Sequence, residues 1–403
     1  MNYDFDEIIQ RAGTGSAKYD LREKLFGDGD VIPMWVADMD FRTPDFIQRA
    51  ILRRMEDPVF GYTLRGDDFF DAVSGWLSRR HGWTIQKPWL TFSPGVVTAL
   101  SIAILGLTEP GDRIVIQPPV YHPFYFVIND NGRELVRNPL VLEGERYRMD
   151  LDHLRSVVDE RTKMLILSNP HNPGGMAWRE EELLALGEVC EEKGIILLSD
   201  EIHSDLAHEG FRHVPAASLS PAMARRTVTC MAPSKTFNTA GLAASVVIIP
   251  DGKLRAGYNR ALNAVHVGFG NIFGNAAMVA AYEEGEPWLE ELLAYIAGNI
   301  DFAAGFFRER IPEIRMMRPE ASFLLWLDCR ALGLDQKRLN AFFCEEAKLG
   351  LNDGTMFGEE GTGFMRMNIA CPRSVLEAAL KQLEAAVRRL PKGAAPAAEP
   401  RGK

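Results

Sequence analysis

The sequence has 403 residues and a formal net charge of −10, and 46% of its residues are hydrophobic while 25% are charged. This composition is ordinary for a soluble globular protein, and the length predicts two domains rather than a single core. The negative charge argues against a nucleic-acid-binding surface. No apolar run approaches the roughly 20 residues that a membrane-spanning helix needs.

The cysteines and the two ends of the chain indicate the compartment. Five cysteines are scattered without a CxxC pair, which predicts reduced thiols in a cytoplasmic protein. The first ten residues are acidic, so we expect no secretory signal there. The tail GAAPAAEPRGK at 393–403 has low complexity and is predicted to be disordered.

The first distinctive strings lie in the N-terminal quarter of the chain. VIPMWVADMDF at 31–41 is explained, taken alone, by an edge strand followed by a turn. FGYTLRG at 60–66 contains Tyr62, which as a lone aromatic residue would be a packing residue. The apolar spacing that follows predicts a helix from Asp67 to His81.

A glycine-containing turn at 91–100, TFSPGVVTAL, leads into a predicted helix. The start of a helix offers free backbone N–H groups and the positive end of the helix dipole, which suit a phosphate group. The string RIVIQPPVYHPF at 113–124 predicts a strand and then a loop that carries Tyr121. This tyrosine could pack in the core or stack on a ligand.

Three strings in the middle of the chain each follow a short apolar run. They are SNPHNPGG at 168–175, SDEIHSD at 199–205 and APSKTFNTAGL at 232–242. Each apolar run predicts a buried strand, and a helical pattern from Arg179 to Lys193 separates the first two. Strand, helix and strand in this order predict a parallel sheet. Because ligands bind beyond the carboxyl ends of such strands, we expect the three strings to meet in one crevice.

These strings supply the amide of Asn172, the carboxylate of Asp200 and the amine of Lys235. A buried lysine beside an acid could form a plain ion pair. It could equally be the Schiff-base lysine of pyridoxal phosphate (PLP), with the acid holding the protonated ring nitrogen. The spacing of the three residues does not decide between these two interpretations.

Two other kinds of site are rejected at this point. Acids and histidines cluster between 201 and 208, but they lack the HExxH spacing, so no metal site is predicted. The string HVGFGNIFGNAA at 266–277 nearly matches GxGxxG. Its last gap is one residue too long and no suitable strand precedes it, so a dinucleotide site is not predicted either.

The C-terminal part begins with a predicted long helix from Glu286 to Glu309. Strands are predicted at 323–328 and 364–370, and helices at 335–348 and 373–390. Arg366 lies inside the second strand, where a buried unpaired charge would be costly. Its partner could be an internal carboxylate or the α-carboxylate of a substrate, which the guanidinium fork suits.

NPHNPGG, DEIH and SKTFNTAGL, in this order, resemble the fold-type-I PLP enzymes, the aspartate aminotransferase superfamily, from about Asp20 to Leu390. The resemblance implies an α/β, PLP-dependent transferase-like fold. A large domain with a mostly parallel central sheet flanked by helices would occupy 49–285. A smaller α+β domain would be built from both termini, 1–48 and 286–392. It also implies a homodimer with shared active sites.

The resemblance also implies roles for single residues. Lys235 would carry PLP and then act as the general base, and Asp200 would keep the ring nitrogen protonated. Asn172 would donate to the phenolic oxygen of the ring. His203 stands where many members of the superfamily carry a tyrosine that contacts the same oxygen, and a histidine there fits the β-lyase branch of the superfamily. Tyr121 would stack on the ring and assist proton transfer.

The remaining implied roles concern the phosphate and the substrate. The phosphate would be bound by the backbone of Gly95, Val96 and Val97, by Ser234, and by Tyr62 from the other subunit. Arg366 would clamp the substrate carboxylate, and the backbone of Ala37 would help to hold the substrate.

Four strings, WVADMDF, DEIHSD, SKTFNTAGLAAS and MRMNIACPR, resemble one branch, the MalY/PatB-type cysteine-sulfur β-lyases. Many aminotransferases carry a phosphate-binding arginine in GLRxG, where this chain has Ala243, so N–H groups and hydroxyls would neutralise the phosphate. We therefore expect a lyase that cleaves L-cystathionine or related cysteine S-conjugates to a thiol, pyruvate and ammonia. The alternatives are an aminotransferase of broad specificity and a regulatory protein without turnover, whose protein partner is unknown.

Overall fold

The computed structural model describes residues 3–391, so the tail at 393–403 lies outside the described residues. Its α-helices are Ala17–Asp20 (α1), Arg22–Phe26 (α2), Asp45–Met55 (α3), Asp67–His81 (α4), Val96–Leu107 (α5), Pro123–Asn129 (α6), Leu151–Val157 (α7), Glu180–Lys193 (α8), Pro221–Arg226 (α9), Gly252–Ala264 (α10), Ile272–Glu284 (α11), Glu286–Arg310 (α12), Gln336–Ala341 (α13) and Arg373–Val387 (α14). Its strands are Ile32–Pro33 (β1), Leu90–Ser93 (β2), Arg113–Ile116 (β3), Glu134–Arg137 (β4), Val141–Glu143 (β5), Arg146–Arg148 (β6), Thr162–Ser168 (β7), Ile196–Asp200 (β8), Thr227–Met231 (β9), Ser245–Ile248 (β10), Arg315–Met317 (β11), Leu324–Asp328 (β12), Leu349–Gly350 (β13), Asn352–Asp353 (β14) and Phe364–Asn368 (β15).

A seven-stranded sheet forms the larger part of the fold, in the order β2-β10-β9-β8-β7-β3-β4. The pairs from β9 to β4 are parallel, whereas β10 runs antiparallel to both of its neighbours. This arrangement confirms the predicted mostly parallel sheet. It also brings the carboxyl ends of β7, β8 and β9 to one edge, as expected from the three strings that follow them.

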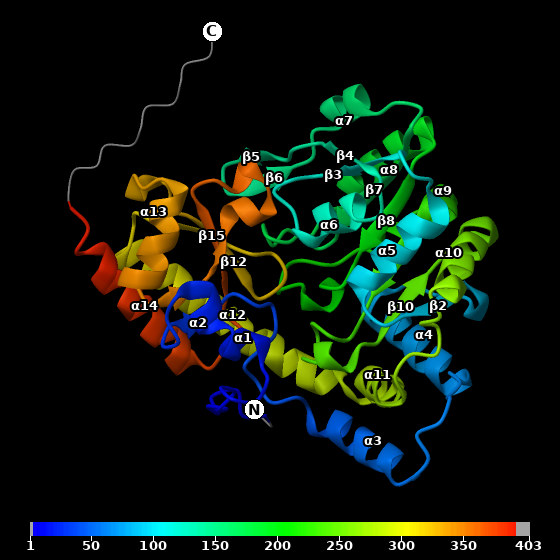
Figure 1. Cartoon of the computed structure of the whole chain (residues 1–403), viewed down its shortest axis with the longest axis horizontal. Helices are drawn as coiled ribbons and strands as arrows, with labels where there is room; N and C mark the ends of the chain where they lie inside the picture. Colours follow the sequence, from blue (N-terminus) through cyan, green and yellow to red (C-terminus); the bar gives the residue numbers. More distant parts are fainter. Residues whose placement is uncertain (1–2, 392–403) are drawn as a thin grey trace.

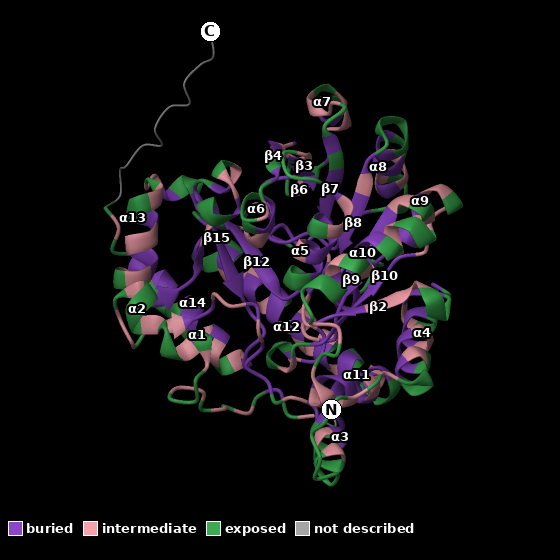
Figure 2. Ribbon diagram, turned by 45° about the vertical axis from the view of Figure 1, so that its right-hand side comes forward, coloured by how far each residue is buried: buried purple, intermediate pink, exposed green. Residues whose placement is uncertain are grey.

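The central strands are continuous apolar runs because both faces of the sheet are covered. On β7, Met164 and Ile166 join the core cluster that contains α5, while Leu165 and Leu167 join the cluster that contains α8. This alternation follows from the two-residue period of a strand. Figure 2 shows the central strands largely in the buried colour. Each fully buried aliphatic side chain contributes roughly 1.5–3 kcal/mol of transfer free energy.

Helix α8 connects β7 to β8, and its ends follow its sequence (Figure 1). At its start the Glu182 carboxylate accepts a hydrogen bond of 2.8 Å from the Arg179 backbone N–H. At its end Gly194 adopts a left-handed conformation with φ of 68°, which glycine tolerates without strain. The predicted strand–helix–strand unit is thus confirmed.

The smaller sheet is antiparallel, in the order β11-β12-β15-β14. The N-terminal segment joins this region, because β1 pairs in parallel with β13. The 25-residue helix α12 precedes the smaller sheet in the chain. Figure 1 shows the two sheets side by side, with β12 and β15 to the left of the larger sheet. We propose domain boundaries at residues 48, 285 and 392, as the sequence suggests.

Several predicted elements differ from the structure by one or two residues at an end, among them the strand expected at 364–370, which ends at Asn368. Larger differences occur in the C-terminal helices and near the N-terminus. The helix expected at 335–348 ends as an α-helix at Ala341, and a π-helical turn continues it over Phe342–Glu346. The helix expected at 373–390 ends at Val387. Of the possible edge strand at 31–41, only Ile32–Pro33 pairs as a strand, and the carbonyls from Trp35 to Asp38 accept hydrogen bonds from side chains instead. Within residues 3–391, no helix combines the length and the apolar character of a membrane span.

Candidate active site

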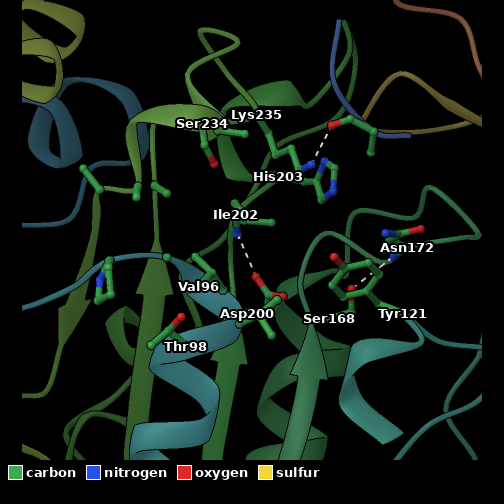
Figure 3. A pocket seen from close by; sticks show the side chains of 18 residues that line it. Val96, Thr98, Tyr121, Ser168, Asn172, Asp200, Ile202, His203, Ser234 and Lys235 are labelled. Atoms are coloured by element: carbon green, nitrogen blue, oxygen red, sulfur yellow. Dashed lines mark hydrogen bonds between the residues drawn. The ribbon is translucent and has the colours of Figure 1, made fainter. Parts of the chain in front are cut away.

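A cavity of about 220 Å³ opens at the carboxyl ends of β7, β8 and β9 (Figure 3). Its lining includes most of the residues predicted for the site: Ala37, Gly95, Val96, Val97, Tyr121, Asn172, Asp200, His203, Ser234 and Lys235. Two predicted residues are not part of this lining. Arg366 adjoins it through a hydrogen bond to Asn172, and Tyr62 lies elsewhere on the surface.

Lys235 lies in the loop after β9, and its amine donates a hydrogen bond of 2.5 Å to the Ala37 carbonyl oxygen. Loss of solvent lowers the pKa of this amine to about 8, and the positive charge of Arg366 acts in the same direction. Asp38 and Asp200 oppose this shift without cancelling it. An amine with such a pKa has a larger neutral, nucleophilic fraction near pH 7 than an ordinary lysine.

Asp200 is the last residue of β8, and its carboxylate accepts a hydrogen bond of 3.2 Å from the Ile202 backbone N–H. Burial raises the pKa of this carboxyl to about 7. A buried carboxyl of this kind is stabilised in its ionised form when a cationic or strongly donating group binds it. The carboxyl group therefore suits a ligand that presents a protonated ring nitrogen.

Asn172 and Arg366 hold each other in place. Arg366 Nη1 donates to Asn172 Oδ1 at 2.9 Å, and Nη2 donates to the Trp35 carbonyl at 3.0 Å and to Asn352 Oδ1 at 2.6 Å. With Asn172 Oδ1 occupied, its amide N–H groups remain as donors for a ligand in the cavity.

The hydrogen-bond partners of Arg366 show whether its charge is balanced by an internal salt bridge or is left for a substrate carboxylate. Only neutral oxygens accept its hydrogen bonds, and among residues 3–391 it forms no ion pair, so an internal salt bridge is not found. Its Nε is buried without a hydrogen-bond partner among these residues. Burial lowers the pKa of the guanidinium to about 10, so it stays charged at neutral pH. The group suits an incoming carboxylate.

Tyr121 and His203 complete the lining near Asp200. Burial raises the pKa of the Tyr121 hydroxyl, and the charge of Asp200 adds to this effect. His203 Nδ1 lies 3.2 Å from the Ser322 hydroxyl oxygen. Burial lowers the pKa of its ring to about 3, so the imidazole is neutral at neutral pH.

The start of α5 and the loop of Ser234 form the other end of the cavity. A Cβ placed on Gly95 would meet no protein atom within 4 Å, so packing within the chain does not require glycine there. Thr98, in the first turn of α5, adds a hydroxyl that sequence reasoning missed. The sequence feature that could have identified Thr98 is a hydroxyl side chain within one turn of the helix start at Gly95. Ala243, in the place of the aminotransferase arginine, also lines this end.

The acids and histidines near 201–208 have partners within the chain. Glu201 bonds to His213 at 2.8 Å, and Asp205 Oδ1 bonds to His81 at 2.8 Å. Asp205 also accepts from Trp76 and Thr236. Within the described part of the chain, no group of three or more such side chains is arranged to hold a metal ion.

Tyr62 lies on the surface, with 94% of its area exposed, and its ring is 5.2 Å from that of Phe269. Phe269 belongs to the glycine-containing string at 266–277, which leads into α11. The two aromatic residues therefore form an exposed pair outside the cavity of their own chain. A role for Tyr62 at the phosphate requires a second subunit.

The donors and acceptors around the cavity fit PLP. Lys235 offers an amine with a lowered pKa and Asp200 a buried carboxyl. Asn172 offers amide hydrogens that donate to no group among residues 3–391. Gly95 at the start of α5 leaves open space beside free backbone N–H groups, an arrangement that suits a phosphate. The lining thus contains a partner for each polar group of this cofactor.

Comparisons with known proteins agree with this reading of the fold. The model of the family described as aminotransferase class I and II matches residues 30–383. The chain is 47% identical to cystathionine beta-lyase PatB of Bacillus subtilis, with 95% of this chain and 99% of that protein covered. It is 31% identical to protein MalY of Escherichia coli, with 96% and 99% covered.

A solved structure shows the same fold. Cystalysin from Treponema denticola, whose crystal structure contains pyridoxal 5'-phosphate, superimposes with a TM-score of 0.94 at 33% identity. The match covers 97% of this chain and all of that one. Such fold and site features define a fold-type-I enzyme of the PLP-dependent class. The chain belongs to the aminotransferase class I and II family.

Proposed function

We propose that this protein is a PLP-dependent carbon–sulfur β-lyase that cleaves L-cystathionine or related cysteine S-conjugates. The observation that carries the proposal is the 47% identity, over 95% of the chain, to a cystathionine β-lyase. The cavity supports it, because Lys235, Asp200 and Tyr121 all line the same space. The products would be a thiol, pyruvate and ammonia, with one water consumed.

PLP, when bound, supplies an electron sink that stabilises negative charge at the substrate Cα. Asp200 would keep the ring nitrogen protonated, which its buried carboxyl can do once it is ionised. Asn172 would donate to the phenolic oxygen through its amide hydrogens, and His203, a neutral ring that lines the same cavity, would stand near it. Tyr121 would pack against the cofactor ring, with its phenol protonated because its pKa is raised.

Lys235 has two tasks, attachment of the cofactor and proton transfer at Cα. Its lowered pKa favours both, because each needs the neutral amine. Once released, the amine can take the Cα proton, after which the bond from Cβ to sulfur breaks and the thiolate leaves. The thiolate needs a proton to leave as a thiol, and the protonated amine or the Tyr121 hydroxyl can supply it.

Arg366 binds the α-carboxylate of the substrate and so orients the amino acid at Lys235. Asn172 and Asn352 fix the direction of the guanidinium before substrate arrives, which reduces the ordering that binding requires. The backbone of Ala37 borders the same space. Many aminotransferases bind the phosphate with an arginine at the position of Ala243. In this chain the phosphate would be bound by the hydroxyls of Thr98 and Ser234 and by the N–H groups after Gly95.

The second subunit is also part of the proposal. Several large apolar side chains are exposed around Tyr62, including Val59, Phe60, Leu64 and Phe269. Exposed apolar residues gathered in this way favour a protein interface. We infer a homodimer with shared active sites, in which Tyr62 reaches the phosphate of the other subunit, and a location in the cytoplasm.

The test follows pyruvate and free thiol together in the purified protein with PLP and L-cystathionine, in the absence of any 2-oxo acid. We expect equal amounts of both, and loss of both in Lys235→Ala. Lys163→Ala, which changes an exposed lysine, is the matched control. If the protein transfers the amino group to an added 2-oxo acid and releases neither pyruvate nor thiol from cystathionine, it is an aminotransferase and not a lyase.

A further inference from the structure

Residues 35–41, called the strap below, lie between β1 and α3 and line the cavity through Ala37. Among residues 3–391, backbone bonds hold this segment just before its start, where Met34 N–H donates to Gly350 O and Met34 O accepts from Asn368 N–H, and near its end, where Asp40 N–H donates to Ala370 O. Between these ties the strap carbonyls accept hydrogen bonds from side chains. Because an unpaired buried carbonyl is costly, these side chains decide where the strap lies.

Asn238 makes three hydrogen bonds to the strap. Its Nδ2 donates to the carbonyls of Met39 and Phe41, each at 3.0 Å, and its Oδ1 accepts from the Met39 backbone N–H at 3.0 Å. Both amide hydrogens and the amide oxygen are therefore used. A side chain with all of its hydrogen-bonding groups committed to one segment suits a positioning role.

The backbone of Asn238 is adapted to this role. Its φ of 57° is left-handed, a conformation in which asparagine is enriched among residues other than glycine. It stands three residues after Lys235, in the same loop. The loop that carries the reactive amine therefore also binds the strap.

Asn368 binds the strap from the smaller sheet. Its Nδ2 donates to the carbonyls of Val36 at 2.6 Å and Asp38 at 2.7 Å, while its Oδ1 accepts from the Ala370 backbone N–H. It follows Arg366 by two residues on β15, so both side chains project from the same face of that strand. Arg366 adds a bond to the carbonyl of Trp35.

The strap carbonyls are thus bound from two sides. Successive carbonyls of an extended chain point in opposite directions. Those of Val36 and Asp38 reach Asn368, while that of Ala37, between them, reaches the amine of Lys235. The strap consequently joins the lysine loop of the larger sheet to the arginine strand of the smaller one.

We propose that Asn238 and Asn368 are positioning residues, which hold the strap between the lysine loop and the arginine strand and thereby place the backbone of Ala37 beside the substrate. The proposal rests on the lyase function only in that the substrate is an amino acid bound at Arg366. The position of the strap itself is independent of which reaction follows.

A competing explanation is that ion pairs alone hold the strap. Arg11 pairs with Asp38 at 2.7 Å and with Asp40 at 2.6 Å, and the buried Lys18 pairs with Asp40 at 2.7 Å. These bonds fix the acidic side chains of the strap. Arg11 Nη1 also donates to the Met39 carbonyl at 3.1 Å, and Lys18 Nζ donates to the Asp38 carbonyl at 3.4 Å. Among residues 3–391, the carbonyls of Val36 and Phe41 accept only from the two asparagines, so the two explanations still differ in what an asparagine substitution does.

The principal variant is Asn238→Gly, which removes the amide while glycine accepts the left-handed backbone without strain. Asn238→Asp is the second variant, because aspartate also tolerates this conformation and keeps an acceptor for the Met39 N–H while losing both donors. The matched control is Lys348→Gly, since Lys348 is exposed and has a left-handed φ of 55°. It lies outside the strap and the cavity.

The first readout is hydrogen–deuterium exchange of the strap amides in the PLP-loaded protein, followed by mass spectrometry of the peptides that cover 35–41. We expect exchange about tenfold faster in Asn238→Gly, as the loss of a few net hydrogen bonds implies. Asn238→Asp should accelerate it as well, and the control should match the unchanged protein. The second readout is a KM for L-cystathionine raised about tenfold with kcat changed less than about threefold.

Strap exchange that is unchanged in both Asn238 variants overturns the proposal and leaves the ion pairs as the support. Equally fast exchange of the strap amides in Lys348→Gly overturns the proposal too, because the effect would then follow from a general loss of stability. A fall in kcat with unaltered KM would remove the link to substrate placement. Failure of the lyase function is recognised separately, as absence of pyruvate and thiol from the unchanged protein.

Discussion

Arg366 Nη1 donates a hydrogen bond of 2.9 Å to Asn172 Oδ1, and this bond joins the smaller sheet to the loop after β7. The two residues are 194 positions apart in the chain. The bond fixes the direction of the guanidinium and occupies Asn172 Oδ1, so the amide hydrogens are the groups of this side chain that remain to donate in the cavity that Asn172 lines. In the proposed function, this single contact connects the residue that binds the substrate carboxylate to a residue that binds the cofactor.

Replacing the guanidinium fork should weaken substrate binding. Arg366→Lys keeps a positive charge but loses the bidentate geometry and the bonds to Asn172 and Asn352. We expect kcat/KM for L-cystathionine to fall by about 100-fold, equivalent to the loss of two charged hydrogen bonds. Arg373→Lys is the control, because Arg373 begins α14 and donates to Asn299 instead. Equal effects of the two substitutions would contradict the clamp.

The lowered pKa of Lys235 predicts how cofactor attachment depends on pH. The amine is protonated below about pH 8 and neutral above it, and only the neutral form attacks the cofactor aldehyde. The rate of PLP attachment to the apoprotein should therefore rise with pH and level off above about 8. Absorbance spectroscopy after rapid mixing measures this rate.

Arg366→Met provides an internal check of this pH profile. The positive charge of Arg366 contributes to the lowered pKa of Lys235, so its removal should raise that pKa and move the profile to higher pH. A profile that stays in place, or that falls with increasing pH, would disprove the assignment of the titrating group.

Thr98 should bind the phosphate although no motif marks it. Thr98→Val keeps the shape of the side chain and removes the hydroxyl, so PLP should bind about tenfold more weakly. Equilibrium titration of the apoprotein with PLP measures the change. Thr43→Val, which alters a threonine outside this cavity, should leave the affinity unchanged. An unaltered affinity in Thr98→Val would show that the hydroxyl does not contact the phosphate.

Shared active sites predict complementation between two inactive variants. In a mixed dimer of Lys235→Ala and Tyr62→Ala subunits, one site has an intact lysine and receives Tyr62 from the other subunit. If subunits exchange freely, half of the dimers are mixed, so activity should return to about a quarter of that of the unchanged protein. Mixing after mild dissociation, followed by the pyruvate assay, tests this. No recovery, in mixtures that contain mixed dimers, would contradict a role for Tyr62 across the interface.

The buried carboxylate of Asp205 should contribute strongly to stability. It accepts hydrogen bonds from His81, Trp76 and Thr236, and these bonds hold its pKa below the ordinary value despite burial. Asp205→Ala leaves these donors unpaired and should destabilise the apoprotein by about 3 kcal/mol. The midpoint of thermal unfolding should fall by several degrees, whereas Asp152→Ala, at a fully exposed carboxylate, should change it little.

Much of the fold follows from local patterns. The strands β7, β8 and β9 and the helices α4 and α8 lie where apolar spacing and capping residues predict them. The helix predicted at 335–348 was less accurate, because its α-helical part ends at Ala341 and a π-helical turn follows. That change depends on how the C-terminal helices pack, which a short sequence window does not contain.

The sequence by itself determined the order of strands and helices, the grouping of Lys235, Asp200 and Asn172 at strand ends, and the family. The spacing of apolar residues and the short motifs can be recognised within a window of a few residues, so predicting these features needs no tertiary information. Only the tertiary structure decided which residues surround that group. Asn238 meets Met39 across 199 positions of sequence, and Asn352 supports Arg366 only because β14 pairs with β15. Such contacts arise when distant segments pack together, and no local pattern specifies them.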